Sequence, residues 1–255
     1  MARQMDDSHR RFLQTLMRSG IVDERAAKKL HQHCCRVHNT HHRPDQLDDY
    51  IDTINSNLQP LFMQIRKGRC EDRGVQHYAL VNMTETSITR MTSDYAEHEL
   101  ELFRKIMDLI VDADSGTASS TKILNCALTL NKKTKKKDTE QLLNRLVHDG
   151  WLSEKQGEYC LSTRCIIEME SYIRTMYQDQ VKECRICHSV AFQSQICENP
   201  MCGIKIHNPC VARFFRGATD PRCPACEDFW PHSIPGNSYG LTFAAFLEML
   251  PYQVY

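Results

Sequence analysis

Apolar residues recur every three or four positions in three stretches of the first 62 residues. That spacing lines them up along one face of an α-helix and predicts helices over residues 9–17, 23–37 and 44–62. Asp23 suits the start of the second helix, and Pro44 suits the first turn of the third. Each helix therefore has one stripe of apolar side chains to bury.

A β-hairpin is predicted directly after the third helix. Residues 63–82 read as two extended arms around the turn Asp72-Arg73-Gly74. Three helices followed by a hairpin are the order of elements in a winged helix. Residues 1–92 are therefore predicted to form one winged-helix domain.

The same order of elements returns in residues 93–180. The predicted elements are helices over 95–112, 119–130 and 138–150, a hairpin over 151–161 and a last helix over 162–180. A serine suits the start of the second of these helices, and Asp138 with Gln141 resembles a capping box at the start of the third. The pattern predicts a second winged helix.

The composition of the 255-residue chain is that of an ordinary globular protein, with 41% hydrophobic and 25% charged residues. Its 32 basic and 32 acidic side chains balance, so attraction to nucleic acid or to an acidic membrane would need a local patch. The polar start of the chain predicts no signal peptide, and the lack of any run of about 18 apolar residues predicts no membrane span. We therefore expect the cytosol or nucleus, where clustered cysteines bind metal more often than they form disulfides.

Winged helices often bind DNA through their third helix, but the second predicted domain is poorly suited to this. The positions expected to be exposed on that helix are Thr139, Glu140, Asn144, Arg145, His148 and Asp149. Their mixed charges favour binding to protein over binding to phosphates. One basic run precedes the helix and consists of Lys132, Lys133, Lys135, Lys136 and Lys137. We interpret the run as a solvated loop, with a nuclear import signal or a nucleic-acid contact as alternatives.

Seven of the 13 cysteines lie between residues 184 and 226. With one histidine they form four ligand pairs: Cys184-x2-Cys187, Cys197-x4-Cys202, His207-x2-Cys210 and Cys223-x2-Cys226. A two-residue gap lets one tight turn aim both side chains at one ion, and thiolate and imidazole are ligands that zinc prefers. Four pairs predict two Zn²⁺ per chain, each held by four protein ligands in a structural rather than hydrolytic site. The spacing leaves open whether the pairs combine in sequence or interleave.

A second group of metal-binding residue types lies at the end of the second predicted helix. On a helix, His31, Cys34, Cys35 and His38 share one face and could hold a metal. We favour the alternative that Cys34 packs as a small apolar residue, while the histidines lie at a helix end and in a solvated loop. The remaining cysteines show no pairing pattern.

The ligand order of four cysteines, one histidine and three cysteines resembles RING domains and their relatives, the PHD fingers. In both families the ligand pairs interleave. The resemblance therefore implies that one zinc is bound by Cys184, Cys187, His207 and Cys210, and the other by Cys197, Cys202, Cys223 and Cys226.

The residues between the ligands favour a RING domain. Ile186 and Pro224 stand where RING domains contact a ubiquitin-conjugating enzyme, and Phe215 or its neighbour Phe214 would add a third contact. PHD fingers usually carry a Trp two residues before the seventh ligand, and this chain has Pro221 there. Active RINGs often carry a basic residue next to the last ligand; Glu227 in that place implies activity that is weak or depends on a partner.

The order of domains and several sequence stretches resemble non-SMC element 1, the RING-bearing subunit of the SMC-5/6 chromosome complex. The matching stretches include "HRRFLQ", "YALVN", "ELFRK" and "ICHS" and extend over about residues 8–235. The long gap in Cys197-x4-Cys202 and the apolar tail 240–255 depart from the pattern that we expect for that family. The fold class expected is mainly α with small β-hairpins (α+β): two winged-helix domains, a small two-zinc RING-like module over residues 181–232, and a tail over 233–255.

The resemblance implies a RING-type ubiquitin ligase subunit that docks a ubiquitin-charged conjugating enzyme and has no catalytic residue of its own. It also implies a heterodimer with a MAGE-family subunit through the winged helices, and a kleisin subunit that completes a trimer. It implies work at nuclear chromosomes in DNA repair by recombination. A contact with DNA through the complex stays open, and no membrane partner is expected.

Two other functions stay open. An architectural subunit would keep its zinc only to fold a docking surface. A PHD-like histone reader would need an acidic groove, whereas the acidic residues of the module are scattered; they are Glu183, Glu198, Asp220 and Glu227.

Overall fold

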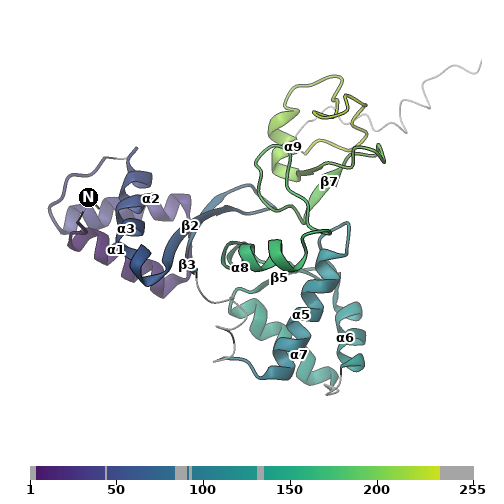
Figure 1. Ribbon diagram of the computed structural model, residues 1–255, viewed down its shortest axis with the longest axis horizontal. Helices are drawn as coiled ribbons and strands as arrows, with labels where there is room; N and C mark the ends of the chain where they lie inside the picture. The colour runs from purple at the N-terminus through teal and green to yellow at the C-terminus, as the bar shows by residue number, and fades with distance from the viewer. Residues whose placement is uncertain (1–3, 44, 84–90, 92–93, 131–134, 236–255) are drawn as a thin grey trace, which may run out of the picture.

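The computed structural model describes residues 4–43, 45–83, 91, 94–130 and 135–235. These residues form three lobes in Figure 1, the first purple to blue, the second teal to green and the third yellow-green. A long hairpin reaches from the first lobe towards the junction of the other two. The expected boundary at residues 92–93 and the tail beyond residue 235 lie outside the described residues.

The first lobe is a winged helix. Its elements are α1 (Asp7–Ser19), β1 (Ile21–Asp23), α2 (Glu24–Val37), α3 (Leu47–Leu58), the short 3₁₀ helix η1 (Gln59–Leu61), β2 (Met63–Arg69) and β3 (Gln76–Asn82). The strands form an antiparallel sheet in the order β1-β3-β2. The side chains of Asp6 and Asp23 accept backbone N–H bonds at the starts of α1 and α2, which explains where these helices begin.

The predicted apolar stripes of the first lobe face its core. Phe12, Leu16 and Ile54 have no exposed surface. Helix α3 begins at Leu47, later than predicted, and the Gln46 N–H just before it bonds to the Arg43 carbonyl (3.1 Å). Pro44, predicted in the first turn, lies outside the described residues. The strand β1 was not predicted, since three residues are too few to show an alternating pattern.

The cysteine- and histidine-rich end of α2 belongs to this core. Cys34 is fully buried, and burial raises the pKa of its thiol to about 11. His31 is buried as well, and its ring centroid lies 4.3 Å from that of Tyr50. The expectation of a solvated histidine is therefore wrong for His31, because the aromatic ring of Tyr50 gives the imidazole an apolar surface to pack on. Burial also lowers the pKa of His31 to about 4.

The second lobe repeats the winged-helix topology. Its elements are α5 (Glu97–Val111), β4 (Ala118–Ser119), α6 (Ser120–Thr129), α7 (Lys136–His148), β5 (Leu152–Lys155), β6 (Glu158–Leu161) and α8 (Thr163–Met176). The sheet order β4-β6-β5 matches that of the first lobe. Ser119 caps α6 by accepting the Lys122 N–H (3.3 Å), as the sequence predicts. The predicted fold class is confirmed.

The start of α7 differs from the prediction. The helix begins at Lys136, two residues before Asp138, and its first turn has no side-chain cap, so Asp138 lies inside the first turn rather than at the cap. Thr139 is buried rather than exposed, and its hydroxyl donates to the Lys135 carbonyl (3.2 Å). The helix ends as predicted before Gly150, whose φ of +74° suits glycine.

The hairpin of the first lobe packs on α8 of the second. Both β2 and β3 contact α8, and Ile167 of α8 is buried against Ala79 and Val81 of β3. Gly68 of β2 lies so close that an added Cβ would be 2.3 Å from Cγ1 of Ile167. The hairpin therefore crosses from one winged helix to the other, as Figure 1 shows.

The third lobe is small and irregular. It contains β7 (Ser194–Ile196), β8 (Lys205–His207) and α9 (Asn208–Phe214), around a core that includes Trp230. Two residues near its start, Val190 and Phe192, are buried in the core of the second lobe instead. Among the described residues, no helix combines the length and the apolarity that a membrane span requires.

Candidate metal centres

Two turns of the third lobe have the same backbone geometry. In the first, the Cys184 N–H bonds to the Ser189 carbonyl and the His188 N–H bonds to the Cys184 carbonyl (both 2.8 Å). In the second, the N–H groups of Cys223 and Glu227 bond to the carbonyls of Asp228 (2.8 Å) and Cys223 (3.0 Å). His188 and Glu227, each following a Cys-x2-Cys pair, have positive φ of 59° and 64°. These tight turns point both thiols of each pair in one direction.

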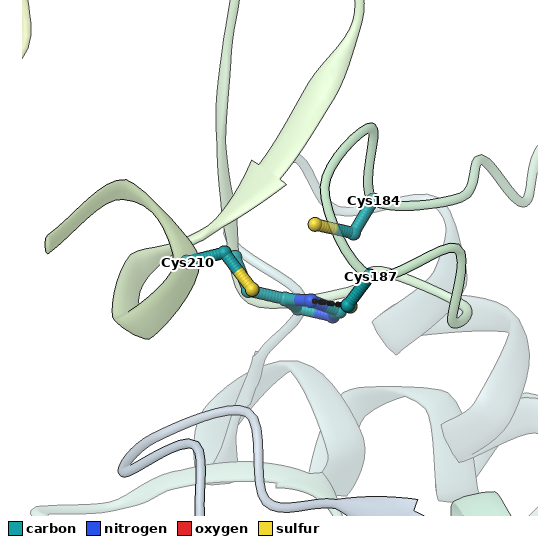
Figure 2. Close-up of side chains that lie close together, drawn as sticks. Cys184, Cys187 and Cys210 are labelled. Atoms are coloured by element: carbon teal, nitrogen blue, oxygen red, sulfur yellow. Dashed lines mark hydrogen bonds between the residues drawn. The ribbon is translucent and has the colours of Figure 1, made fainter. Parts of the chain in front are cut away.

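The first cluster joins one of these turns to β8 and α9. It consists of Cys184, Cys187, His207 and Cys210, whose ligand atoms all lie within 4.8 Å of one another. In Figure 2 the thiols of Cys184 and Cys187 come from one turn of the chain and that of Cys210 from α9. His207 Nδ1 lies 3.3 Å from Cys187 Sγ, so this ring nitrogen faces the centre of the cluster.

The second cluster consists of Cys197, Cys202, Cys223 and Cys226. The Sγ atoms of Cys197 and Cys226 are 3.6 Å apart, and those of Cys202 and Cys223 are 3.7 Å apart. Tetrahedral Zn–S bonds of about 2.3 Å separate two sulfur atoms by about 3.8 Å, so the thiols already have the spacing that a zinc ion requires.

The long gap between Cys197 and Cys202 closes through a local turn. The side chain of Asn199 accepts the Met201 N–H (2.9 Å), and its carbonyl accepts the N–H groups of Cys202 and Gly203 (both 3.0 Å). The turn brings Cys202 back towards Cys197 despite the two extra residues. The longer gap between Cys197 and Cys202 therefore does not prevent both thiols from joining the same cluster.

The ligands of the first cluster influence one another's charge. Hydrogen bonds from Cys187 and Cys210 lower the pKa of Cys184, more than burial raises it. Burial opposes the charging of His207, but hydrogen bonds to Cys184, Cys187 and Glu71 raise its pKa to about 12. Hydrogen bonds to Cys184 and Cys187 raise the pKa of Cys210, so the ligands of this cluster share protons with one another.

The structure groups the ligands in the interleaved arrangement that the resemblance to RING and PHD domains implies, and not in sequence. All 13 cysteines are free thiols. Within the described part of the chain, these two groups are the clusters that could hold a metal ion, and the residues around His31 and Cys34 are not among them.

Comparisons with known proteins agree with this architecture. The family model described as the Nse1 non-SMC component of the SMC5-6 complex matches residues 9–169. The chain belongs to this family. A RING-like domain model matches residues 184–226, from the first ligand to the last.

The relatives of this Nse1-family chain include proteins named non-structural maintenance of chromosomes element 1 homolog. The Xenopus laevis protein is 52% identical over 92% of this chain and 87% of its own length. The human protein is 51% identical over 91% of this chain and 86% of its own. A chain from a solved Nse1-Nse3-Nse4 complex has a TM-score of 0.82 at 52% identity, covering 91% of this chain and all of its own.

The residues suggested for docking a conjugating enzyme differ in exposure in this Nse1-family chain. Ile186 and Pro224 are half-buried, each between the two cysteines of a Cys-x2-Cys pair. Phe215 is only 3% exposed and packs on Trp230 (5.6 Å between ring centroids). The suggestion of a surface role for Phe215 is therefore wrong, because the small core of the lobe needs this ring. Its neighbour Phe214 is 48% exposed, so its side chain could still contact a partner protein.

The basic run is only partly described. Lys132 and Lys133 lie outside the described residues, whereas Lys135, Lys136 and Lys137 are exposed at the start of α7. On the same helix Arg145 forms an ion pair with Glu99 (2.7 Å) and lies over the ring of Tyr95. This arginine is thus engaged within the lobe.

One residue of the metal centre could not be found from the sequence. Glu71 in the turn of the β2–β3 hairpin accepts a hydrogen bond from the ring of His207 (3.0 Å). The two residues are 136 positions apart, and the sequence around Glu71 shows only an ordinary polar turn. No local spacing signals such a contact.

Proposed function

We propose that this chain binds two zinc ions and acts as the RING-type ubiquitin ligase subunit of an SMC5-6 complex. The observation that carries the proposal is the pair of interleaved clusters, which fix the two turns containing Ile186 and Pro224. The solved Nse1-Nse3-Nse4 complex supports assembly with a MAGE-family subunit and a kleisin subunit. Membership of the SMC5-6 family supports work at nuclear chromosomes, in DNA repair by recombination.

The chemistry of the two clusters favours a structural role for the metal. Four protein ligands per ion leave no open position for water or substrate, so zinc in these clusters stabilises the lobe rather than performing hydrolysis. The nucleophilic cysteine of the ubiquitin transfer would belong to the conjugating enzyme. This chain would contribute the position and orientation of the reacting thioester.

The turns that hold the ligands suit the docking of a partner. Ile186 stands between Cys184 and Cys187, so a metal ion would hold its backbone on both sides. A rigid apolar side chain loses little conformational entropy when a partner binds. Glu227, exposed beside the last ligand, is acidic where active RINGs often carry a basic residue, and this favours activity that depends on the MAGE-family partner.

We expect two zinc ions per chain. Each cluster supplies four ligand atoms within 4.8 Å of one another, which is the full set for one tetrahedral ion. The measurement is elemental analysis of natively folded protein, purified without added metal and washed with a weak chelator. A value of one zinc or none would contradict the assignment, and two equivalents of another metal would contradict the identity of the ion alone.

Replacing Ile186 by Ala should lower ubiquitin discharge by the assembled complex several-fold. The change removes apolar contact area at the docking position and leaves all eight ligands in place, so zinc content and assembly with the MAGE-family partner should stay normal. Met201→Ala is the matched control, because Met201 is 94% exposed and lies in the same lobe between Cys197 and Cys202. The measurement is the rate of discharge of a ubiquitin-charged conjugating enzyme.

The same assay separates the ligase from an architectural subunit. Discharge that is measurable and equal in wild type, Ile186→Ala and Met201→Ala would remove the proposed docking position. If no conjugating enzyme responds even with the MAGE-family partner present, the architectural role is the better description. The acidic Glu227 is the observation that favours this second candidate.

Two further functions have less support. A histone reader needs free acidic groups, but Asp220 pairs with Arg222 (2.8 Å) and Glu183 pairs with Arg174. The ion pair between Arg145 and Glu99 likewise favours protein binding over DNA binding by α7. A DNA contact through Lys135, Lys136 and Lys137 stays a proposal for the assembled complex.

A further inference from the structure

The turn of the β2–β3 hairpin is fixed between the first and third lobes. The Cys70 N–H bonds to the Val75 carbonyl (2.9 Å), and the Gly74 N–H bonds to the Cys70 carbonyl (2.7 Å). Gly74 has a φ of +68°, and a Cβ added there would lie 2.7 Å from Pro209 at the start of α9. A side chain in this turn therefore has a defined direction relative to the third lobe.

Glu71 projects from this turn into the third lobe. The residue is 7% exposed, which is unusual for a carboxylate. Its Oε1 accepts the Phe192 N–H (2.8 Å), and its Oε2 accepts the Gln193 N–H (3.1 Å). These peptide groups compensate part of the cost of burying the charge. The remaining hydrogen bond is the one to His207.

The hydrogen bonding of His207 defines which ring nitrogen would bind a metal. Nδ1 faces Cys187, whereas Nε2 lies 3.0 Å from both Glu71 Oε1 and the Val190 carbonyl. Both neighbours of Nε2 accept hydrogen bonds, so Nε2 keeps its proton, and Nδ1 is the nitrogen whose lone pair would face a bound metal. This is the tautomer that a metal ligand requires.

We propose that Glu71 is a positioning residue of the first metal centre, which couples the occupancy of that centre to the docking of the β2–β3 hairpin. A carboxylate that accepts the second N–H of a ligating histidine fixes the orientation of the ring and raises its basicity. Here the carboxylate comes from a different domain than the ligands. The inference rests on the proposed binding of zinc but not on the proposed ligase activity.

The Val190 carbonyl offers a competing explanation. It also accepts from Nε2 (3.0 Å) and could hold the tautomer alone. The two acceptors differ in charge, because only Glu71 carries a negative charge that strengthens the bond between His207 and a cation. Removing the carboxylate therefore tests the proposal while Val190 keeps the ring oriented.

The first test compares zinc release from the full chain in wild type, Glu71→Gln, Glu71→Ala and Asp72→Asn. Asp72 is exposed in the same turn, so Asp72→Asn makes the same change of charge as Glu71→Gln without the contact. Outer carboxylates of this kind change metal affinity by about 10–100-fold. Release of one zinc into excess chromophoric chelator should become about tenfold faster in Glu71→Gln and faster still in Glu71→Ala. The other zinc, and both zincs of Asp72→Asn, should behave as in wild type.

Substitution with Co²⁺ identifies the centre that changes. A centre with three thiolates and one imidazole has different ligand-field bands from a centre with four thiolates. The bands of the first centre should shift in Glu71→Gln while those of the second stay unchanged. A general loss of structure would disturb both centres alike and would contradict a positioning role, and unchanged release in both Glu71 variants would show that Val190 is sufficient.

A second measurement uses only the wild-type chain, in case the variants fold poorly. Coupling acts in both directions, so removal of zinc by a chelator should raise hydrogen exchange in the hairpin turn, residues 70–75, at least severalfold. Exchange in α1, whose buried residues belong to the separate core of the first lobe, should stay constant. Unchanged exchange at the turn would overturn the coupling, whereas a chain that never contains zinc would instead overturn the metal assignment.

Discussion

Cys187→Ser, or removal of both metals, should unfold the third lobe and leave both winged helices folded. Zinc binding by clusters of this kind contributes about 10–16 kcal/mol to folding at neutral pH, far more than the small core around Trp230 can replace. The first and second lobes have their own clusters of buried side chains, for example around Phe12 and around Phe103. Their helices therefore do not need the metal.

The chain contains two tryptophans, and they report on different lobes. Trp230 is 1% exposed in the third lobe, and Trp151 is buried in the second. On loss of the metal we expect the fluorescence of Trp230 to shift to the red, while the circular dichroism of the helices changes little, since α9 has only seven residues. Hydrogen exchange should rise across residues 184–230 and not in α1.

The second lobe should nevertheless lose some stability. Phe192 belongs to the core of the second lobe, although it lies near the start of the third. If unfolding of the third lobe removes Phe192 from this core, the free energy of unfolding of the second lobe should fall by about 1–3 kcal/mol. The melting temperature of the winged helices should fall by about 5–10 °C. Cys126→Ser on α6 is the control, because Cys126 is outside both clusters and should leave every signal unchanged. Loss of the whole helical signal in Cys187→Ser would mean that the lobes fold as one unit.

The sequence predicts those features that depend on neighbouring residues. The stripe containing Phe12 and Leu16, the cap at Ser119 and the paired ligands are all local patterns, and the structure contains them as expected. The short strands β1 and β4 have three and two residues, too few to show a period. They become strands because β3 and β6 provide partners from far along the chain.

The contacts between lobes could not be predicted, since no periodicity encodes them. The sequence shows two adjacent phenylalanines after Cys210, and only the position of Trp230 decides that Phe215 is buried and Phe214 is exposed. In the sequence, Glu71 is an ordinary turn residue. Its burial depends on contacts with residues far along the chain, the N–H groups of Phe192 and Gln193. In the sequence, Gly68 looks like a residue that weakens its strand. The structure shows that a glycine is needed there because the side chain of Ile167, from another domain, occupies the space of a Cβ atom.

Gly68→Ala should loosen the packing of the β2–β3 hairpin on α8 and destabilise the chain by about 1–3 kcal/mol. Gly68 is paired with His77 inside the sheet, so it cannot move away without breaking the register of β2. The methyl group of an alanine would lie 2.3 Å from Cγ1 and 2.7 Å from Cδ1 of Ile167. Ile167 is 3% exposed and has little room to change its rotamer.

Ile167→Ala provides the second arm of a double-mutant cycle. Ile167→Ala alone should lower the free energy of unfolding by about 2–5 kcal/mol, because it removes apolar contacts and leaves a cavity beside α8. It also removes the Cγ1 and Cδ1 atoms that collide with an alanine at position 68, and leaves only Cβ, at an ordinary contact distance of 3.7 Å. The double variant should therefore be about as stable as Ile167→Ala alone.

The expected signature is a coupling of about 1–3 kcal/mol between two residues of different domains. It can be measured from chemical unfolding followed by hydrogen exchange in β2, β3 and α8, so that loosening of the hairpin is distinguished from unfolding of either lobe. Additive effects of the two substitutions would mean that the hairpin does not rest on α8 in solution. Strong coupling would establish that the hairpin is braced on the second winged helix, which is the condition for Glu71 at its tip to reach His207 at a fixed distance.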